Sequence, residues 1–139
     1  MTVSMLRPDT RAEYKHLLDL ESESIHIIRE VVAEFERPAL LFSGGKDSAV
    51  LLHLAVKALH PASLPFPVVH IDTGHNFPEV LSFRDRITKA LNLELVVGSV
   101  EAAIAAGSIP TPTESDASRN RLQTPVLLET IKQGRFTAV

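Results

Sequence analysis

The order of hydrophobic and polar positions along the chain predicts an alternation of helices and buried strands. Between residues 10 and 35, hydrophobic residues recur three or four positions apart, which is the spacing of one face of an amphipathic helix. Thr10 and Glu13 have the spacing of a capping box, so we expect this helix to begin near Thr10. The residue before a proline disfavours the helical conformation, so Pro38 indicates that the helix ends near residue 35.

Short, continuous hydrophobic runs predict strands that are buried on both faces of a parallel sheet. These runs occupy residues 39–42, 68–71 and 93–97, and residues 136–139 predict the start of a fourth strand. Further helices are expected over residues 49–59, 78–91, 101–106 and 120–133. This alternation is typical of an α/β fold, a Rossmann-like sandwich with helices on both faces of a parallel sheet. Ligands of such folds bind beyond the carboxyl ends of the strands.

The length of 139 residues fits one domain. We place an α/β domain at residues 14–139, behind an N-terminal arm of residues 1–13. The chain ends where the fourth strand is expected to begin, and we therefore expect a domain that is incomplete at its C-terminus. The alternative is that residues 136–139 form a short edge strand.

Composition and charge narrow the classes of function. The formal net charge of −3 argues against a nucleic-acid partner, because nucleic-acid-binding surfaces are usually basic. No hydrophobic run is long enough to cross a bilayer and no signal peptide is recognisable, so we expect a cytoplasmic protein with no membrane partner. The chain contains no cysteine, which excludes disulfides, thiolate metal sites and a cysteine nucleophile within it.

The most distinctive motif lies between the first predicted strand and the next helix. It consists of Ser43, Gly44, Gly45, Lys46, Asp47 and Ser48. Paired glycines allow backbone conformations closed to other residues and let a ligand approach the backbone closely. The amides at the start of a helix, the two hydroxyls and the lysine are then suited to bind phosphate, with Asp47 facing Mg²⁺ or supporting the loop. The spacing matches neither a Walker A loop nor G-x-G-x-x-G.

A second polar cluster ends the second predicted strand. Asp72, Thr73 and Gly74 are interpreted as lining a nucleotide cleft, with His75 and Asn76 close to the phosphates. An alternative takes His70, Asp72 and His75 as ligands of a transition metal. No helix fixes the spacing of these three residues, so we favour the cleft and interpret His70 as a residue of the strand.

Residues 43–48 resemble the pyrophosphatase loop, S-G-G-x-D-S, of the PP-loop ATP-binding superfamily, whose members cleave ATP between the α and β phosphates. Residues 21–30, 64–77 and 118–124 are in addition similar to the small, catalytic subunits of bacterial sulfate adenylyltransferases. The resemblance covers nearly the whole chain and implies an adenine nucleotide α-hydrolase-like fold. In that family the chain continues well past this length, which agrees with an incomplete domain.

The resemblance implies that ATP and sulfate react to give adenylyl sulfate and pyrophosphate, in sulfate assimilation. The implied cofactors are ATP and Mg²⁺, and the implied partner is a GTPase large subunit, in a heterodimer or a larger assembly. Within that reaction we expect Ser43, Lys46 and Ser48 to hold the pyrophosphate and Asp47 to lie near Mg²⁺. Arg119 is the candidate for binding sulfate or the α-phosphate, because a guanidinium pairs with two oxygens. The alternative for Arg119 is a solvated surface side chain.

Two other functions fit the same loop. One is another PP-loop enzyme, either a phosphoadenylyl-sulfate reductase or a tRNA-thiolating enzyme, although such chemistry generally requires cysteine. The other is a non-catalytic module that binds a nucleotide and regulates a partner. We also expect this chain alone to bind ATP only weakly.

Overall fold

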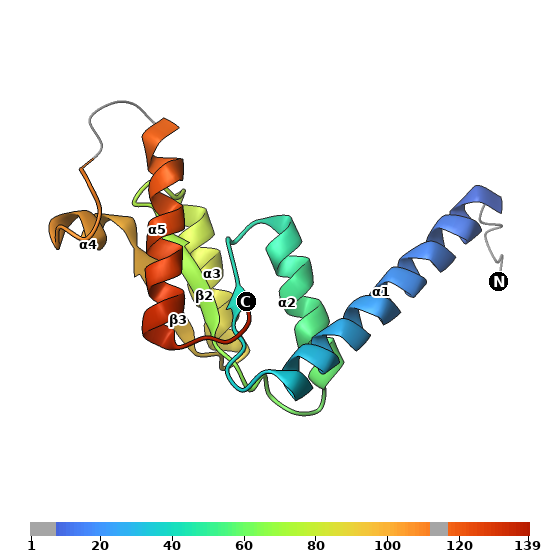
Figure 1. Ribbon diagram of the computed structural model, residues 1–139. Helices are drawn as coiled ribbons and strands as arrows, with labels where there is room; N and C mark the ends of the chain where they lie inside the picture. The colour runs from blue at the N-terminus through green and yellow to red at the C-terminus, as the bar shows by residue number, and fades with distance from the viewer. Residues whose placement is uncertain (1–7, 112–116) are drawn as a thin grey trace.

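The computed structural model describes residues 8–111 and 117–139, with the side chains of residues 11–111 and 121–139. Helices and strands alternate along the described chain (Figure 1). In order, they are α1 (Pro8–Glu34), β1 (Leu40–Leu41), α2 (Lys46–Leu59), β2 (Val68–Asp72), α3 (Pro78–Ala90), β3 (Leu95–Ser99), α4 (Val100–Ala105) and α5 (Ala117–Gly134). This order confirms the predicted α/β class.

The three strands form one parallel sheet in the order β1-β2-β3. Leu40 pairs with Val68 across the first two strands, and Val68 pairs with Leu95 across the second and third. The carboxyl ends of all three strands therefore meet at one edge of the sheet. The loops that follow β1 and β2 lie at this edge, as the sequence predicted.

The expected fourth strand is reduced to one parallel bridge, between Pro38 and Ala138. The Ala138 carbonyl accepts a hydrogen bond of 2.9 Å from the Ala39 N–H, so this segment does lie beside β1. The prediction of a strand beginning at residue 136 is wrong, because the Phe136 N–H donates to the Ile131 carbonyl at 3.1 Å. That bond makes Phe136 part of the turn that closes α5.

Helices pack on both faces of the sheet, and each face has its own hydrophobic cluster. Figure 1 shows α5 in front of the sheet and α3 behind it. The cluster formed by β1, β2 and α2 contains Leu40, Phe42, Leu52, Ala55, Phe66 and Val68, with side chains of α1 and α3 packed against it. The cluster beneath α5 contains Val100, Ile109, Leu122 and Val126.

α1, α2 and α5 begin two or three residues earlier than the sequence predicted, and α4 begins one residue earlier. α1 starts at Pro8, so Thr10 lies inside its first turn and not at a capping position. α5 starts at Ala117 and accommodates Pro125 in its interior. α2 starts at Lys46, inside the glycine-rich motif, which places Lys46 and Asp47 in its first turn. A helix of this length directs its unpaired N–H groups and partial positive charge toward that motif.

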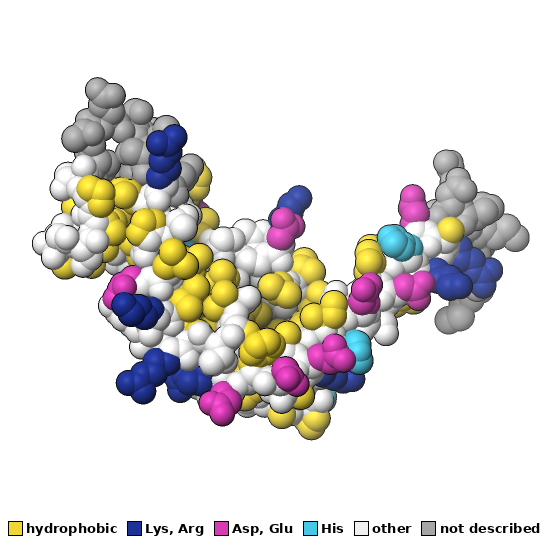
Figure 2. Space-filling model, viewed as in Figure 1, with side chains coloured by type: hydrophobic (Ala, Val, Ile, Leu, Met, Phe, Trp, Pro, Cys, Tyr) yellow, Lys and Arg dark blue, Asp and Glu magenta, His cyan; other side chains and the backbone are white. Residues whose placement is uncertain are grey.

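The N-terminal part of α1 extends away from the sheet, while its C-terminal part packs along α2 (Figure 1). Tyr14 and Leu17 on the extended part are 62% and 61% exposed. Hydrophobic side chains also gather between α1 and α5 on the face shown in Figure 2. Part of this surface is a groove of about 350 Å³, lined by α1, β1, α2, Ala138 and Val139. No described helix combines the length and the hydropathy that crossing a bilayer requires.

Gly98 in β3 determines how closely α5 approaches the sheet. A Cβ atom at this position would overlap the Thr130 hydroxyl of α5 and lie 2.8 Å from the Ile71 side chain. We expect Gly98→Ala to lower the free energy of unfolding by about 1–3 kcal/mol, as overpacking of a core does. Urea unfolding measures this change. Leu128→Ala serves as the control, because Leu128 on α5 is 61% exposed and its truncation should cost less than about 0.5 kcal/mol.

Candidate nucleotide-binding site

The loop after β1 requires glycine at its second position. Gly44 has φ +83°, a left-handed conformation that residues with a Cβ rarely adopt. A Cβ on Gly44 would also lie only 2.6 Å from Cγ1 of Val80 in α3. Gly45 differs from Gly44, because its φ of −79° is open to other residues and its nearest neighbour is the Ser43 hydroxyl at 3.4 Å. The first glycine therefore shapes the turn and admits the start of α3.

Hydrogen bonds from the two serines hold the loop closed on itself. The Ser43 hydroxyl accepts from the Gly45 N–H at 3.3 Å and donates to the Ser48 hydroxyl at 3.2 Å. Ser48 in turn donates to the Gly45 carbonyl at 2.9 Å. This network fixes the turn before a ligand binds, which lowers the entropy cost of binding.

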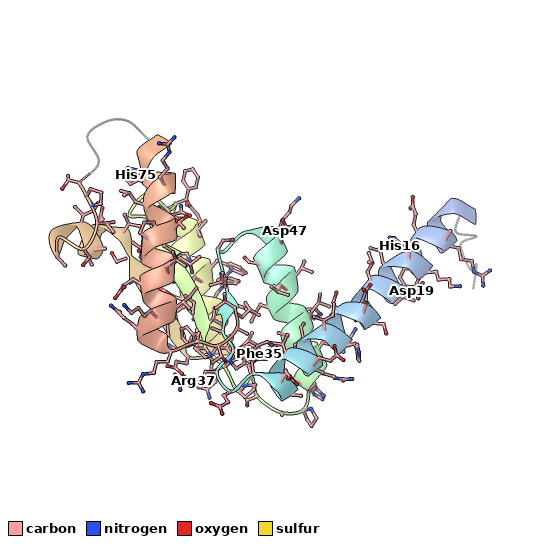
Figure 3. The ribbon with its side chains drawn as sticks, viewed as in Figure 1. His16, Asp19, Phe35, Arg37, Asp47 and His75 are labelled. Carbon is pink, nitrogen blue, oxygen red and sulfur yellow. The ribbon has the colours of Figure 1, made fainter. Side chains whose placement is uncertain are left out.

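The start of α2 leaves donors available for an anion. Gly45 is the N-cap of this helix and provides no side-chain cap for its first N–H groups. The side chains of Lys46 and Asp47 are exposed. Figure 3 shows Asp47 at the upper end of α2, on the same edge of the molecule as His75. Helix N–H groups, a lysine and hydroxyls at one edge form an arrangement suited to phosphate.

The loop after β2 is shaped by bonds from side chains to its own backbone. Oδ1 of Asp72 accepts from the Gly74 N–H at 2.8 Å, and Oγ1 of Thr73 accepts from the His75 N–H at 3.2 Å. Gly74 has φ +75°, and a Cβ there would overlap the carboxylate of Glu101 in α4. Asp72, Thr73 and Gly74 therefore serve first to build the loop, and the exposed His75 lies at its surface.

One residue of this region has a role that the sequence did not reveal. His70 is only 2% exposed, and its Nδ1 lies 2.8 Å from the carbonyl oxygen of Phe42, the residue before the glycine loop. The register of the parallel strands was the missing information, because the position of His70 opposite β1 depends on it. Within the described residues, no group of three His, Cys, Asp or Glu side chains is placed to hold a metal ion. The alternative of a site formed by His70, Asp72 and His75 therefore has no geometric support.

Arg119 lies within α5, but its side chain is outside the described residues, as are residues 112–116. The assignment of sulfate or the α-phosphate to Arg119 remains a prediction. The structure brings together the glycine loop and the loop after β2, which come from neighbouring strands.

Residues 37–137 match the phosphoadenosine phosphosulfate reductase domain family. The chain belongs to this family. The match includes the whole sheet, both loops and α2 to α5, so the candidate site lies entirely within the phosphoadenosine phosphosulfate reductase domain.

The chain is also similar to proteins named sulfate adenylyltransferase subunit 2. It is 60% identical over 126 residues to that of Mycobacterium sp. (strain KMS), a match that covers 91% of this chain and 40% of the relative. It is 56% identical over 126 residues to that of Mycobacterium tuberculosis (strain ATCC 25177 / H37Ra), with the same coverage of 91% and 40%. The chain thus spans about 40% of the length of these curated relatives.

Solved structures with the same fold include two synthetases. The NH3-dependent NAD synthetase from Campylobacter jejuni aligns with a TM-score of 0.64 and 19% identity, over 87% of this chain and 54% of that protein. The NMN synthetase from Francisella tularensis aligns with a TM-score of 0.58 and 21% identity, over 86% of this chain and 52% of that protein. At these identities the likeness establishes the fold of the phosphoadenosine phosphosulfate reductase domain and nothing more.

Proposed function

We propose that this chain forms the ATP-binding part of a sulfate adenylyltransferase small subunit, which converts ATP and sulfate to adenylyl sulfate and pyrophosphate. The observation that supports this most is the closed glycine loop at the carboxyl end of β1, with the first turn of α2 behind it. The 60% identity to a protein of that name supports the choice of substrates. A phosphoadenylyl-sulfate reductase has less support, because the curated relatives that are 56–60% identical to this chain are named sulfate adenylyltransferase subunit 2.

In the proposed reaction a sulfate oxygen forms a bond to the α-phosphorus of ATP. The bond from that phosphorus to the oxygen bridging to the β-phosphate breaks, and pyrophosphate leaves with the electron pair. Such a displacement requires little covalent chemistry from the protein, so positioning and charge stabilisation dominate. The loop amides and Lys46 hold the pyrophosphate, and Lys46 neutralises its developing charge. The hydroxyls of Ser43 and Ser48 join them by turning their protons from their partners within the loop to the phosphate oxygens.

The residues around the loop fit a magnesium ion shared with ATP. Mg²⁺ prefers oxygen ligands and is commonly held by one or two carboxylates together with substrate phosphates. Asp47 provides an exposed carboxylate in the first turn of α2, the same turn that holds Lys46 and Ser48. When bound, the ion would neutralise phosphate charge and orient the leaving group.

The remaining assignments extend the site outward from the loop. Asp72, Thr73, Gly74 and His75 line the nucleotide cleft, with His75 nearest the phosphates. Arg119 binds sulfate or the α-phosphate, because its planar guanidinium can donate hydrogen bonds to two oxygens at once. The words "subunit 2" in the names of the relatives support a partner subunit, for which we propose a GTPase large subunit in the cytoplasm.

Sulfate-dependent release of pyrophosphate from ATP tests this proposal. The assay uses the chain alone and a chimera in which it replaces the matching 126 residues of the mycobacterial relative, each with the large subunit of that relative. We expect turnover by the chimera that requires sulfate. ATP binding without sulfate-dependent turnover would support a non-catalytic nucleotide-binding module instead.

A further inference from the structure

A buried histidine lies directly behind the glycine loop. His70 is in β2, and its side chain points to the same face of the sheet as Phe42 and Val68, into the cluster covered by α2 and α3. A buried imidazole is costly unless its nitrogens have hydrogen-bond partners. Both of its nitrogens have such a partner, and together the partners link the two loops of the site.

The first partner fixes the position of the proton on the ring. Nδ1 of His70 lies 2.8 Å from the carbonyl oxygen of Phe42, and a carbonyl can only accept a hydrogen bond. Nδ1 therefore carries the proton. The Phe42 N–H donates to the Val69 carbonyl at 2.8 Å, so β2 holds both backbone polar groups of the residue that precedes Ser43.

The second partner continues the connection to the loop after β2. Nδ2 of Asn76 lies 3.4 Å from Nε2 of His70 and also 3.4 Å from Oδ1 of Asp72. Because a carboxylate only accepts, the amide nitrogen of Asn76 and not its oxygen must face both neighbours, and Nε2 of the neutral ring accepts. Oδ1 of Asp72 also accepts from the Gly74 N–H at 2.8 Å. A chain of hydrogen bonds thus runs from the Phe42 carbonyl to the Gly74 amide.

We propose that His70 is a positioning residue, neutral and protonated at Nδ1, which fixes the glycine loop relative to the loop after β2. This inference rests on the proposed function in one respect, which is that ATP is the ligand of the fixed loop. A loop that already has its binding conformation loses less entropy when the phosphates bind. Loss of the bond to Phe42 therefore weakens ATP binding, whereas loss of the bond to Asn76 has a smaller effect.

The first test measures the tautomer in the unmodified chain. Long-range ¹H–¹⁵N spectra of the imidazole distinguish a protonated from an unprotonated ring nitrogen. We expect His70 to show a protonated Nδ1 and an unprotonated Nε2. A proton on Nε2 instead would overturn the proposal, because the Phe42 carbonyl would then have no donor.

The second test separates the two hydrogen bonds by substitution. The amide nitrogen of asparagine can replace Nδ1 of histidine, so His70→Asn keeps the bond to Phe42, whereas His70→Leu loses both bonds at a similar volume. We expect ATP affinity to fall about five- to tenfold in His70→Leu, the equivalent of one hydrogen bond, and by no more than about twofold in His70→Asn. The matched control is His53→Leu, since His53 is an exposed residue of α2.

Wild-type affinity in His70→Leu would contradict the positioning role. If His70→Leu does not fold, Asn76→Ala and His70→Asn are compared instead. The proposal gives the bond to Phe42 a larger effect on ATP affinity than the bond to Asn76. A lower ATP affinity in Asn76→Ala than in His70→Asn would therefore overturn it. These affinities are measured in the chimera, and if ATP fails to bind the chimera that carries the unmodified His70, the proposed function fails. His70 is then judged on its tautomer alone.

Discussion

Lys46→Ala is expected to lower sulfate-dependent pyrophosphate release by the chimera at least about tenfold, the scale of one polar contact to a charged group. Lys46 lies in the first turn of α2, where its ammonium can neutralise charge on the leaving pyrophosphate. The substitution removes this charge without disturbing the hydrogen bonds of Ser43 and Ser48. The matched control is Lys57→Ala, because Lys57 lies in the last turn of the same helix and pairs with Glu21 of α1.

Asp47→Ala should reduce the same rate to a similar degree if its carboxylate helps to hold Mg²⁺, and the concentration of Mg²⁺ that gives half-maximal rate should rise. Asp19→Ala is the control, since Asp19 lies on the extended part of α1, far from Asp47 in Figure 3. Unchanged turnover in both Lys46→Ala and Asp47→Ala would remove the loop from the active site.

Gly44→Ala is expected to lower the free energy of unfolding by about 2 kcal/mol or more and to abolish detectable ATP binding. A left-handed conformation costs a residue with a Cβ roughly 1–2 kcal/mol. Overlap of the new methyl group with Val80 adds a packing cost of about 1–3 kcal/mol. Urea unfolding and calorimetric titration with ATP measure the two effects.

Gly45→Ala is the matched control for stability, because Gly45 has a negative φ and more space around its Cα. Gly45→Ala should lower the free energy of unfolding by less than about 1 kcal/mol. The double variant Gly44→Ala/Val80→Ala relieves the overlap with the Val80 side chain but keeps the strained left-handed backbone. Part of the decrease in the free energy of unfolding should therefore remain. Equal stabilities of Gly44→Ala and Gly45→Ala would contradict the left-handed conformation of Gly44 and its close approach to Val80.

The sequence was informative where local patterns determine structure. Continuous hydrophobic runs predicted β1, β2 and β3, and the glycine pair between a strand and a helix located the candidate site. These features depend on residues close together in the chain. Propensity alone also favoured a strand over residues 136–139, but the hydrogen bond from the Phe136 N–H to the Ile131 carbonyl makes the start of that run part of the turn after α5.

The role of His70 depends on contacts between residues far apart in the sequence. Its link to Phe42 follows from the register of β1 against β2, which hydrophobic patterning does not determine. The early start of α2 at Lys46 has a local cause instead. The hydrogen bonds among Ser43, Gly45 and Ser48 support a helical turn inside a motif whose glycines predicted a loop.

The central claim is that the backbone N–H groups of residues 44–48 surround the polyphosphate of ATP. Titration of the ¹⁵N-labelled chain with ATP, at millimolar concentrations that suit weak binding, tests it most directly. The account predicts that the amide resonances of residues 44–48 shift most, and that adenosine without phosphates leaves them unchanged. Largest shifts elsewhere in the chain, with the resonances of residues 44–48 unmoved at saturation, would contradict it.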